Sequence, residues 1–116
     1  MKLYSTFFLF LLLNFSCAQS SSKSITEVSQ NELNSVILVD VRTPEEYELG
    51  HLENAKNIDW FDENFSEIFE MISKEETIYV YCKKGGRSAK AQQLLDSLGY
   101  KKVVNLTGGY DAYVEK

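Results

Sequence analysis

Cys82 begins the segment of this 116-residue chain whose residue types and spacing are best suited to chemistry. The residues after it are Lys83, Lys84, Gly85, Gly86, Arg87 and Ser88. Two adjacent glycines allow a tight backbone turn with its N–H groups facing inward, and a helix that starts at Ser88 adds partial positive charge. Such a turn binds an anion, so we expect a reactive thiolate at Cys82, held by residues 83–88.

The thiolate needs more stabilisation than a helix terminus supplies. A free cysteine has a pKa of about 8.5, and a helix terminus contributes about 0.3–1 kcal/mol, which lowers that pKa by less than about one unit. The inward N–H donors and the cations Lys83, Lys84 and Arg87 are expected to supply the rest. Because a persulfide is more acidic than a thiol, the same turn suits a Cys82 that carries a second sulfur atom. The alternative is a structural cysteine at a strand end, with both lysines in a solvated turn.

Four short apolar segments are expected to form the sheet that positions this loop. Residues 36–41 and 77–81 are nearly continuous apolar runs, typical of strands covered on both faces. Shorter strands are expected at 55–58 and 103–106. Helical segments separate these strands, which predicts a small α/β fold with a mostly parallel sheet flanked by helices on both faces. The loop after residue 81 then lies at the carboxyl ends of the strands, where ligands bind in such sheets.

The helices are expected from their caps and apolar spacing. Ser29 has capping-box spacing to Glu32, Thr43-Pro44 starts a short helix, and residues 88–98 form the longest one. A further set of apolar residues recurs at helical spacing and is interpreted as core: Phe61, Phe65, Ile68, Phe69 and Ile72.

Other polar residues are weaker candidates for function. Asp40 and Arg42 lie at the end of the first buried strand, where they can brace the loop or each other, and Arg42 is a candidate to contact an anionic substrate. His51, the only histidine, is interpreted as part of a structural turn rather than as a catalytic base. The acids of the helical segments are interpreted as solvated: Glu45, Glu46, Glu48, Glu63, Glu67 and Glu70.

The first residues predict export. Residues 1–16 combine Lys2 with an apolar run too short to span a bilayer, as in a signal peptide. Lipidation of Cys17 is expected, followed by a polar tether over 17–24 and a domain over 25–116. Cleavage after Ala18 is the rival, and a Cys17–Cys82 disulfide is a further alternative. The expected location is the periplasmic side of a bacterial membrane, with a lipid anchor and no transmembrane helix.

The composition limits the partners. The formal charge is −5 and no basic run occurs, which argues against nucleic acid. One histidine beside one free cysteine falls short of the ligands that a metal needs, and no organic cofactor is implied.

Four segments, in order, resemble the rhodanese family. Residues 82–88 resemble its active loop, Cys-x-x-Gly-x-Arg-Ser, and residues 39–52 its upstream strand and helix. Residues 55–58 and 105–110 are similar to two later landmarks. The chain departs from the family at Asn54, where glycine is frequent, and at Tyr113, where tryptophan is frequent.

The resemblance implies a thiosulfate sulfurtransferase-like enzyme. Sulfur would pass from thiosulfate or a protein persulfide to a thiol or cyanide through a Cys82 persulfide. Phosphatase or arsenate-reductase relatives have Cys-x5-Arg, whereas Cys82 to Arg87 is Cys-x4-Arg, a narrower ring that suits one sulfur atom. A sulfur-relay or protein-binding module without turnover and a redox-sensing thiol remain open as alternatives.

Overall fold

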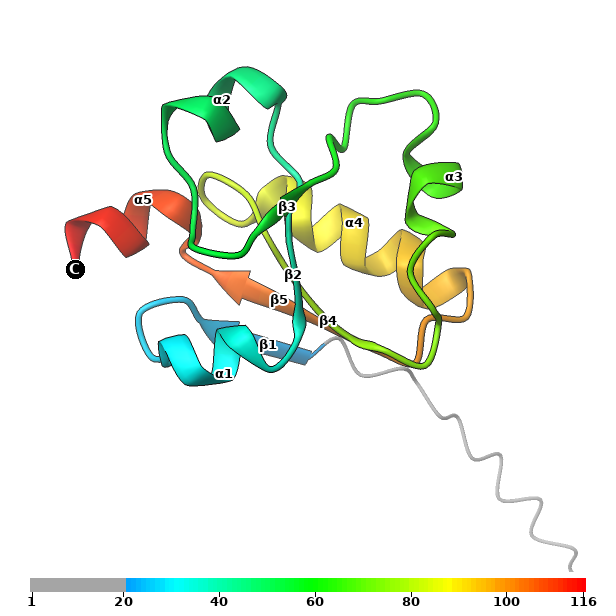
Figure 1. The fold of residues 1–116 in the computed structure, drawn as a ribbon, viewed down its shortest axis with the longest axis horizontal. Coiled ribbons are helices and arrows are strands. Elements are labelled where there is room, and N and C mark those ends of the chain that lie inside the picture. Colours follow the sequence, from blue (N-terminus) through cyan, green and yellow to red (C-terminus); the bar gives the residue numbers. More distant parts are fainter. Residues whose placement is uncertain (1–20) are drawn as a thin grey trace, which may run out of the picture.

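The strands of the computed structural model, which describes residues 21–116, form one sheet with helices on both faces (Figure 1). Their order is β1-β5-β4-β2-β3, and every pair of neighbours is parallel. The strands are β1 (Ser21–Ser24), β2 (Ile37–Asp40), β3 (Lys56–Asn57), β4 (Thr77–Tyr81) and β5 (Lys102–Thr107). The predicted α/β class is confirmed, and the described sheet is parallel throughout.

The helices of the described residues are α1 (Gln30–Asn34), α2 (Pro44–Leu49), α3 (Phe65–Phe69), α4 (Gly86–Ser97) and α5 (Gly109–Glu115). Successive residues of the central strands point to opposite faces, so they divide the core into two clusters. Val39 and Val80 pack with Leu95 of α4, whereas Leu38 packs with Leu33 of α1 on the other face. Apolar residues on both faces of β2 and β4 therefore explain why these strands lie inside the sheet.

Strand β1 corrects the predicted domain boundary. The sequence predicts a polar tether over 17–24, but Ser21–Ser24 pairs with β5, Ser21 opposite Val104. Gln92 of α4 also donates from Nε2 to the Ser21 carbonyl at 2.6 Å. The domain therefore includes this edge strand, which is held by backbone hydrogen bonds rather than by apolar side chains.

The predicted signal peptide, the processing sites and Cys17 lie outside the described residues. Within residues 21–116, none of the helices combines the length and apolarity needed to cross a bilayer.

The predicted caps are present. Ser29 Oγ accepts the Glu32 N–H at 3.1 Å. Thr43 forms a full capping box with Glu46, because each residue's side chain accepts the other's backbone N–H. Pro44 occupies the first turn of α2, so this short helix starts where the sequence predicts.

The predicted apolar stripe over 61–72 is only partly helical. Phe65 and Phe69 are buried in α3 as expected, but Phe61 is 66% exposed and does not belong to the core. Asp59 and Asp62 accept backbone N–H groups two residues ahead, from Phe61 and Asn64. These side-chain turns compete with helical hydrogen bonds, so α3 begins only at Phe65.

Candidate active site

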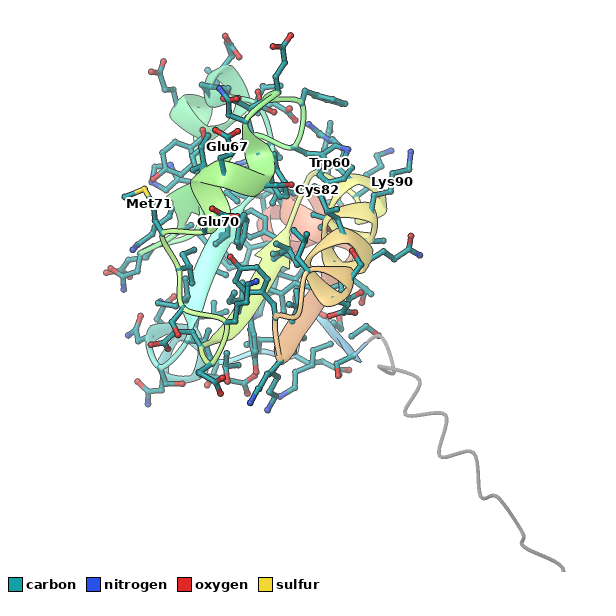
Figure 2. All side chains as sticks on the ribbon, turned by 90° about the vertical axis from the view of Figure 1, so that its right-hand side faces the viewer. Trp60, Glu67, Glu70, Met71, Cys82 and Lys90 are labelled. Carbon is teal, nitrogen blue, oxygen red and sulfur yellow. The ribbon has the colours of Figure 1, made fainter. Side chains whose placement is uncertain are left out.

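Cys82 lies directly after β4, between the carboxyl ends of β2 and β5, and is 2% exposed. Figure 2 shows it inside the molecule, whereas Met71 projects from the surface. The chain turns at Gly85, whose φ of +115° favours glycine, and α4 begins at Gly86, two residues before the predicted start. The loop therefore spans only residues 82–85 between a central strand and the longest helix.

The Cys82 sulfur is held by donors of this loop and of the first turn of α4. The Gly85 N–H donates to Sγ at 3.0 Å, and Ser88 Oγ lies 3.4 Å from it. Burial raises the pKa of the Cys82 thiol, but hydrogen bonds from the Ser88 side chain and from the backbone of Ser88, Gly85 and Lys84 outweigh it. The pKa of Cys82 is therefore lowered, as a nucleophilic thiolate requires.

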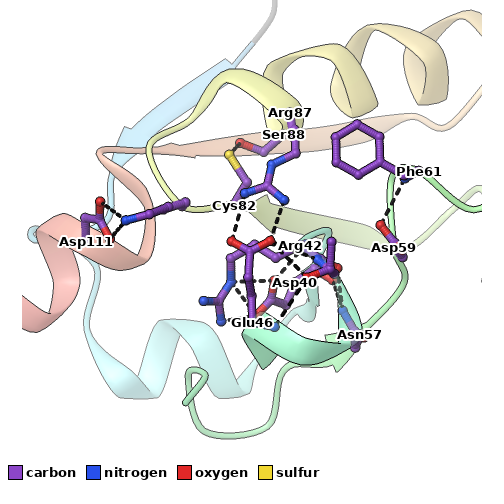
Figure 3. A network of polar contacts seen from close by, with 12 residues as sticks. Asp40, Arg42, Glu46, Asn57, Asp59, Phe61, Cys82, Arg87, Ser88 and Asp111 are labelled. Carbon is purple, nitrogen blue, oxygen red and sulfur yellow. Dashed lines mark hydrogen bonds and ion pairs between the residues drawn. The ribbon is translucent and has the colours of Figure 1, made fainter. Parts of the chain in front are cut away.

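Two of the three loop cations, Arg87 and Lys83, are paired with carboxylates. Arg87 donates from both Nη atoms to the Glu46 carboxylate, at 2.7 and 3.0 Å, and Lys83 donates to Asp111 at 2.7 and 2.8 Å (Figure 3). The hydrogen bonds from Arg87 hold the pKa of Glu46 at about 2, below its usual 4.5. Lys84 is exposed and makes no side-chain hydrogen bond within the described residues. The interpretation of Glu46 as merely solvated is therefore wrong. Hydroxyl and backbone N–H donors make the largest contributions that lower the pKa of Cys82.

Asp40 and Arg42 form a buried ion pair. Arg42 Nη2 donates to Asp40 Oδ2 at 2.6 Å and to the Gly50 carbonyl at 2.7 Å, while Nε donates to Asp40 Oδ1 at 3.0 Å. The guanidinium also lies 4.3 Å from the ring centroid of Tyr110. The two residues brace each other, as the sequence suggests, and tie the end of β2 to the end of α2 and to α5.

The first turn of α5 fixes the backbone at Cys82, a contact that sequence reasoning missed. Tyr110 N–H donates to the Cys82 carbonyl at 2.8 Å, and Asp111 N–H donates to the Lys83 carbonyl at 3.0 Å. This approach requires Gly109, because an added Cβ would lie 2.6 Å from the Cys82 carbonyl oxygen. In the sequence, the adjacent pair Gly108-Gly109 was the feature that could have indicated this close contact.

A pocket of about 220 Å³ opens beside the loop. Its walls are Arg42, Glu46, Leu49, Lys83, Tyr110 and Asp111. Cys82 is not part of these walls, so a molecule bound in the pocket would contact the side chains around the loop rather than the sulfur itself. No group of three potential metal ligands is found within residues 21–116.

The fold and this loop define an α/β domain with a buried cysteine, whose pKa is lowered, at the carboxyl end of a central strand. The model of the rhodanese-like domain matches residues 24–116, and the chain belongs to this family. The positive φ of Asn54, +68°, agrees with the family's frequent glycine at that position.

Several proteins are similar to this chain over the rhodanese-like domain. The chain is 37% identical to thiosulfate sulfurtransferase 18 of Arabidopsis thaliana over 89 residues, which cover 66% of this chain and 65% of that protein, somewhat less than two thirds of its length. It is 37% identical over 84 residues to a tRNA uridine(34) hydroxylase of Escherichia fergusonii, covering 69% of this chain but 24% of that protein. The human single-domain sulfurtransferase TSTD1 superposes with a TM-score of 0.68 at 28% identity, covering 84% of this chain and 97% of that one.

Proposed function

We propose that this protein is a sulfurtransferase that carries sulfane sulfur as a persulfide on Cys82. The observation that carries this proposal is the buried Sγ that accepts the Gly85 N–H at 3.0 Å and lies 3.4 Å from Ser88 Oγ in a Cys-x4-Arg loop. Donors that stabilise a thiolate also suit the persulfide anion that replaces it. The sulfurtransferase names of two relatives agree with this chemistry.

The transfer needs two displacement steps at sulfur. In the first, the Cys82 thiolate attacks the outer sulfur of thiosulfate or of a persulfide R–S–S⁻. The S–S bond of the donor breaks, sulfite or the thiolate R–S⁻ leaves with its electron pair, and Cys82–S–S⁻ forms. In the second step, a thiolate or cyanide attacks the terminal sulfur and leaves as a persulfide or thiocyanate, which regenerates the Cys82 thiolate. Atoms and charge balance without a redox cofactor or metal.

Loss of sulfur loading at Cys82 tests the proposal. The full chain is incubated with thiosulfate or with glutathione persulfide, and its intact mass is measured before and after cyanide. We expect the wild type to gain one sulfur atom and to release it as thiocyanate, and Cys82→Ser to gain none. Cys17→Ser is the matched control, because it removes the chain's other cysteine and should load normally. Equal loading of Cys82→Ser and wild type would refute the carrier role.

A sulfur-relay or protein-binding module is the second candidate. Two apolar side chains near the site are exposed, Leu49 on the rim of the pocket and Phe61, whose ring lies 5.7 Å from the Arg87 guanidinium. In this case Cys82 would load with sulfur but turn over slowly with small acceptors. A partner retained equally by wild type and Cys82→Ser would favour the module over the enzyme.

For the location, we propose a lipid anchor at Cys17 on the periplasmic side of a bacterial membrane. The support is the sequence alone, an apolar run followed by small Ser16 and a polar stretch. Mass spectrometry of the mature N-terminus tests this proposal. Lipoprotein processing would leave a lipidated Cys17 as the first residue, whereas cleavage after Ala18 would leave an unmodified Gln19.

A further inference from the structure

The cations around Cys82 have almost no free charge to offer a substrate. Asp40 holds Arg42 at 2.6 Å, Glu46 holds Arg87 with two hydrogen bonds, and Asp111 holds Lys83 with two more. Within the described residues, only Lys84 of these four cations lacks a carboxylate partner. Once Cys82 is a thiolate, the group as a whole has no net positive charge.

The low net charge around Cys82 affects the binding of thiosulfate and of organic persulfides differently. Thiosulfate carries two negative charges and must approach a thiolate, so it depends on unpaired cations at the mouth of the site. The persulfide group of an organic persulfide carries at most one negative charge, and the attached carbon chain can contact apolar surface. The pocket supplies such surface through Tyr110 and through Leu49, which is 92% exposed.

From these contacts we propose that Asp111 determines donor specificity, favouring organic persulfides over thiosulfate by neutralising Lys83. This inference rests on the proposed sulfur transfer and names the substrate class of that same site. Asp111 acts in two separable ways, because its N–H anchors the Lys83 carbonyl at 3.0 Å while its carboxylate holds the Lys83 ammonium. The side chain can therefore be changed without removing the backbone bond that fixes the loop.

Asp111 is better placed for this role than Glu46. The Asp111 and Lys83 side chains are 31% and 53% exposed, so the ammonium can swing toward the pocket once it is released. Glu46 also completes the cap of α2, so its replacement disturbs the fold as well as the charge.

The test compares two donors in Asp111→Asn. The kcat/KM for thiosulfate should rise about three- to tenfold at low ionic strength, the effect of one freed charge on a dianion, and the gain should shrink as salt is added. The kcat/KM for the persulfide of 2-mercaptoethanol, whose only charge lies on the persulfide group, should rise only about two- to threefold, because a monoanion gains half the free energy that a dianion gains. In Asp111→Asn combined with Lys83→Gln, the thiosulfate gain should disappear. Glu115→Gln, an exposed change of the same charge on α5, should leave both donors unaffected.

The outcomes separate this inference from the proposed function. If no donor loads Cys82 in any variant, sulfur transfer itself is refuted. If persulfide loads Cys82 but Asp111→Asn leaves the ratio of the two donors unchanged, only the role of Asp111 is overturned. A wild type that uses thiosulfate more efficiently than the persulfide of 2-mercaptoethanol would also overturn it.

Discussion

Replacing Glu46 with glutamine removes the charge that faces Arg87 and keeps the size of the side chain. The pKa of Glu46 is depressed from 4.5 to about 2, which corresponds to a ceiling of about 3 kcal/mol at about 1.4 kcal/mol per unit. Both side chains keep some contact with solvent, 28% for Glu46 and 21% for Arg87, so screening reduces this to about 2 kcal/mol. We therefore expect Glu46→Gln to lower the free energy of unfolding by about 2 kcal/mol near neutral pH.

The pH dependence has a definite sign. A carboxylate with a depressed pKa contributes its full stability above its unfolded pKa, here 4.5, and loses it as the pH falls toward about 2. Urea unfolding of both proteins should therefore differ most at about pH 7 and much less at about pH 3. Glu45→Gln is the matched control, because Glu45 is an exposed acid of the same first turn without the Arg87 contact.

Two results would contradict this reasoning. If Glu46→Gln and Glu45→Gln lose the same stability at neutral pH, the loss reflects the helix terminus and not the pair with Arg87. If the difference between wild type and Glu46→Gln persists unchanged at about pH 3, the lowered pKa of Glu46 is not its cause.

Two further substitutions test the contacts that hold the sulfur and the backbone of Cys82. Ser88→Ala removes the hydroxyl that lies 3.4 Å from Cys82 Sγ, so the pKa of Cys82 should rise. Alkylation of Cys82 by iodoacetamide near neutral pH should therefore be slower. Ser97→Ala, on the same helix, should leave the rate of alkylation unchanged. Gly109→Ala places a Cβ against the Cys82 carbonyl at a φ of +65°, so urea unfolding should show a loss of about 2 kcal/mol or more. Gly86→Ala, with open space around its Cβ, should cost far less, and equal losses would exclude the α5 contact as the cause.

The sheet and the loop could be predicted because their signals are local. The apolar runs of β2 and β4 reflect burial on both faces, and the consecutive glycines Gly85 and Gly86 indicate the turn after Cys82. Strand β1 could not be predicted in this way. Its sequence, Ser-Ser-Lys-Ser, has little β preference, and it pairs through backbone groups with a strand about eighty residues later in the chain.

The partners of the loop cations were hidden for a related reason. Glu45 and Glu46 are adjacent acids in the same helical turn, and only the placement of α2 against α4 decides that Glu46 meets Arg87. Asp111 gives equally little sign that it lies beside Lys83. Proximity between distant segments therefore determined which charges belong to the site.

In the proposed mechanism, reactivity and donor specificity depend on different parts of the site. The donors to the sulfur stay in place because the loop is fixed on both sides. The first turn of α5 binds the Cys82 and Lys83 carbonyls, and the Gly85 carbonyl accepts from Ser88, from the Ala89 N–H at 3.1 Å and from Asn105. The hydrogen bonds that lower the pKa of Cys82 most come from Ser88, Gly85 and Lys84. A change at Asp111 should therefore alter the choice of donor at constant thiol reactivity, and a change at Ser88 should alter reactivity toward every donor alike.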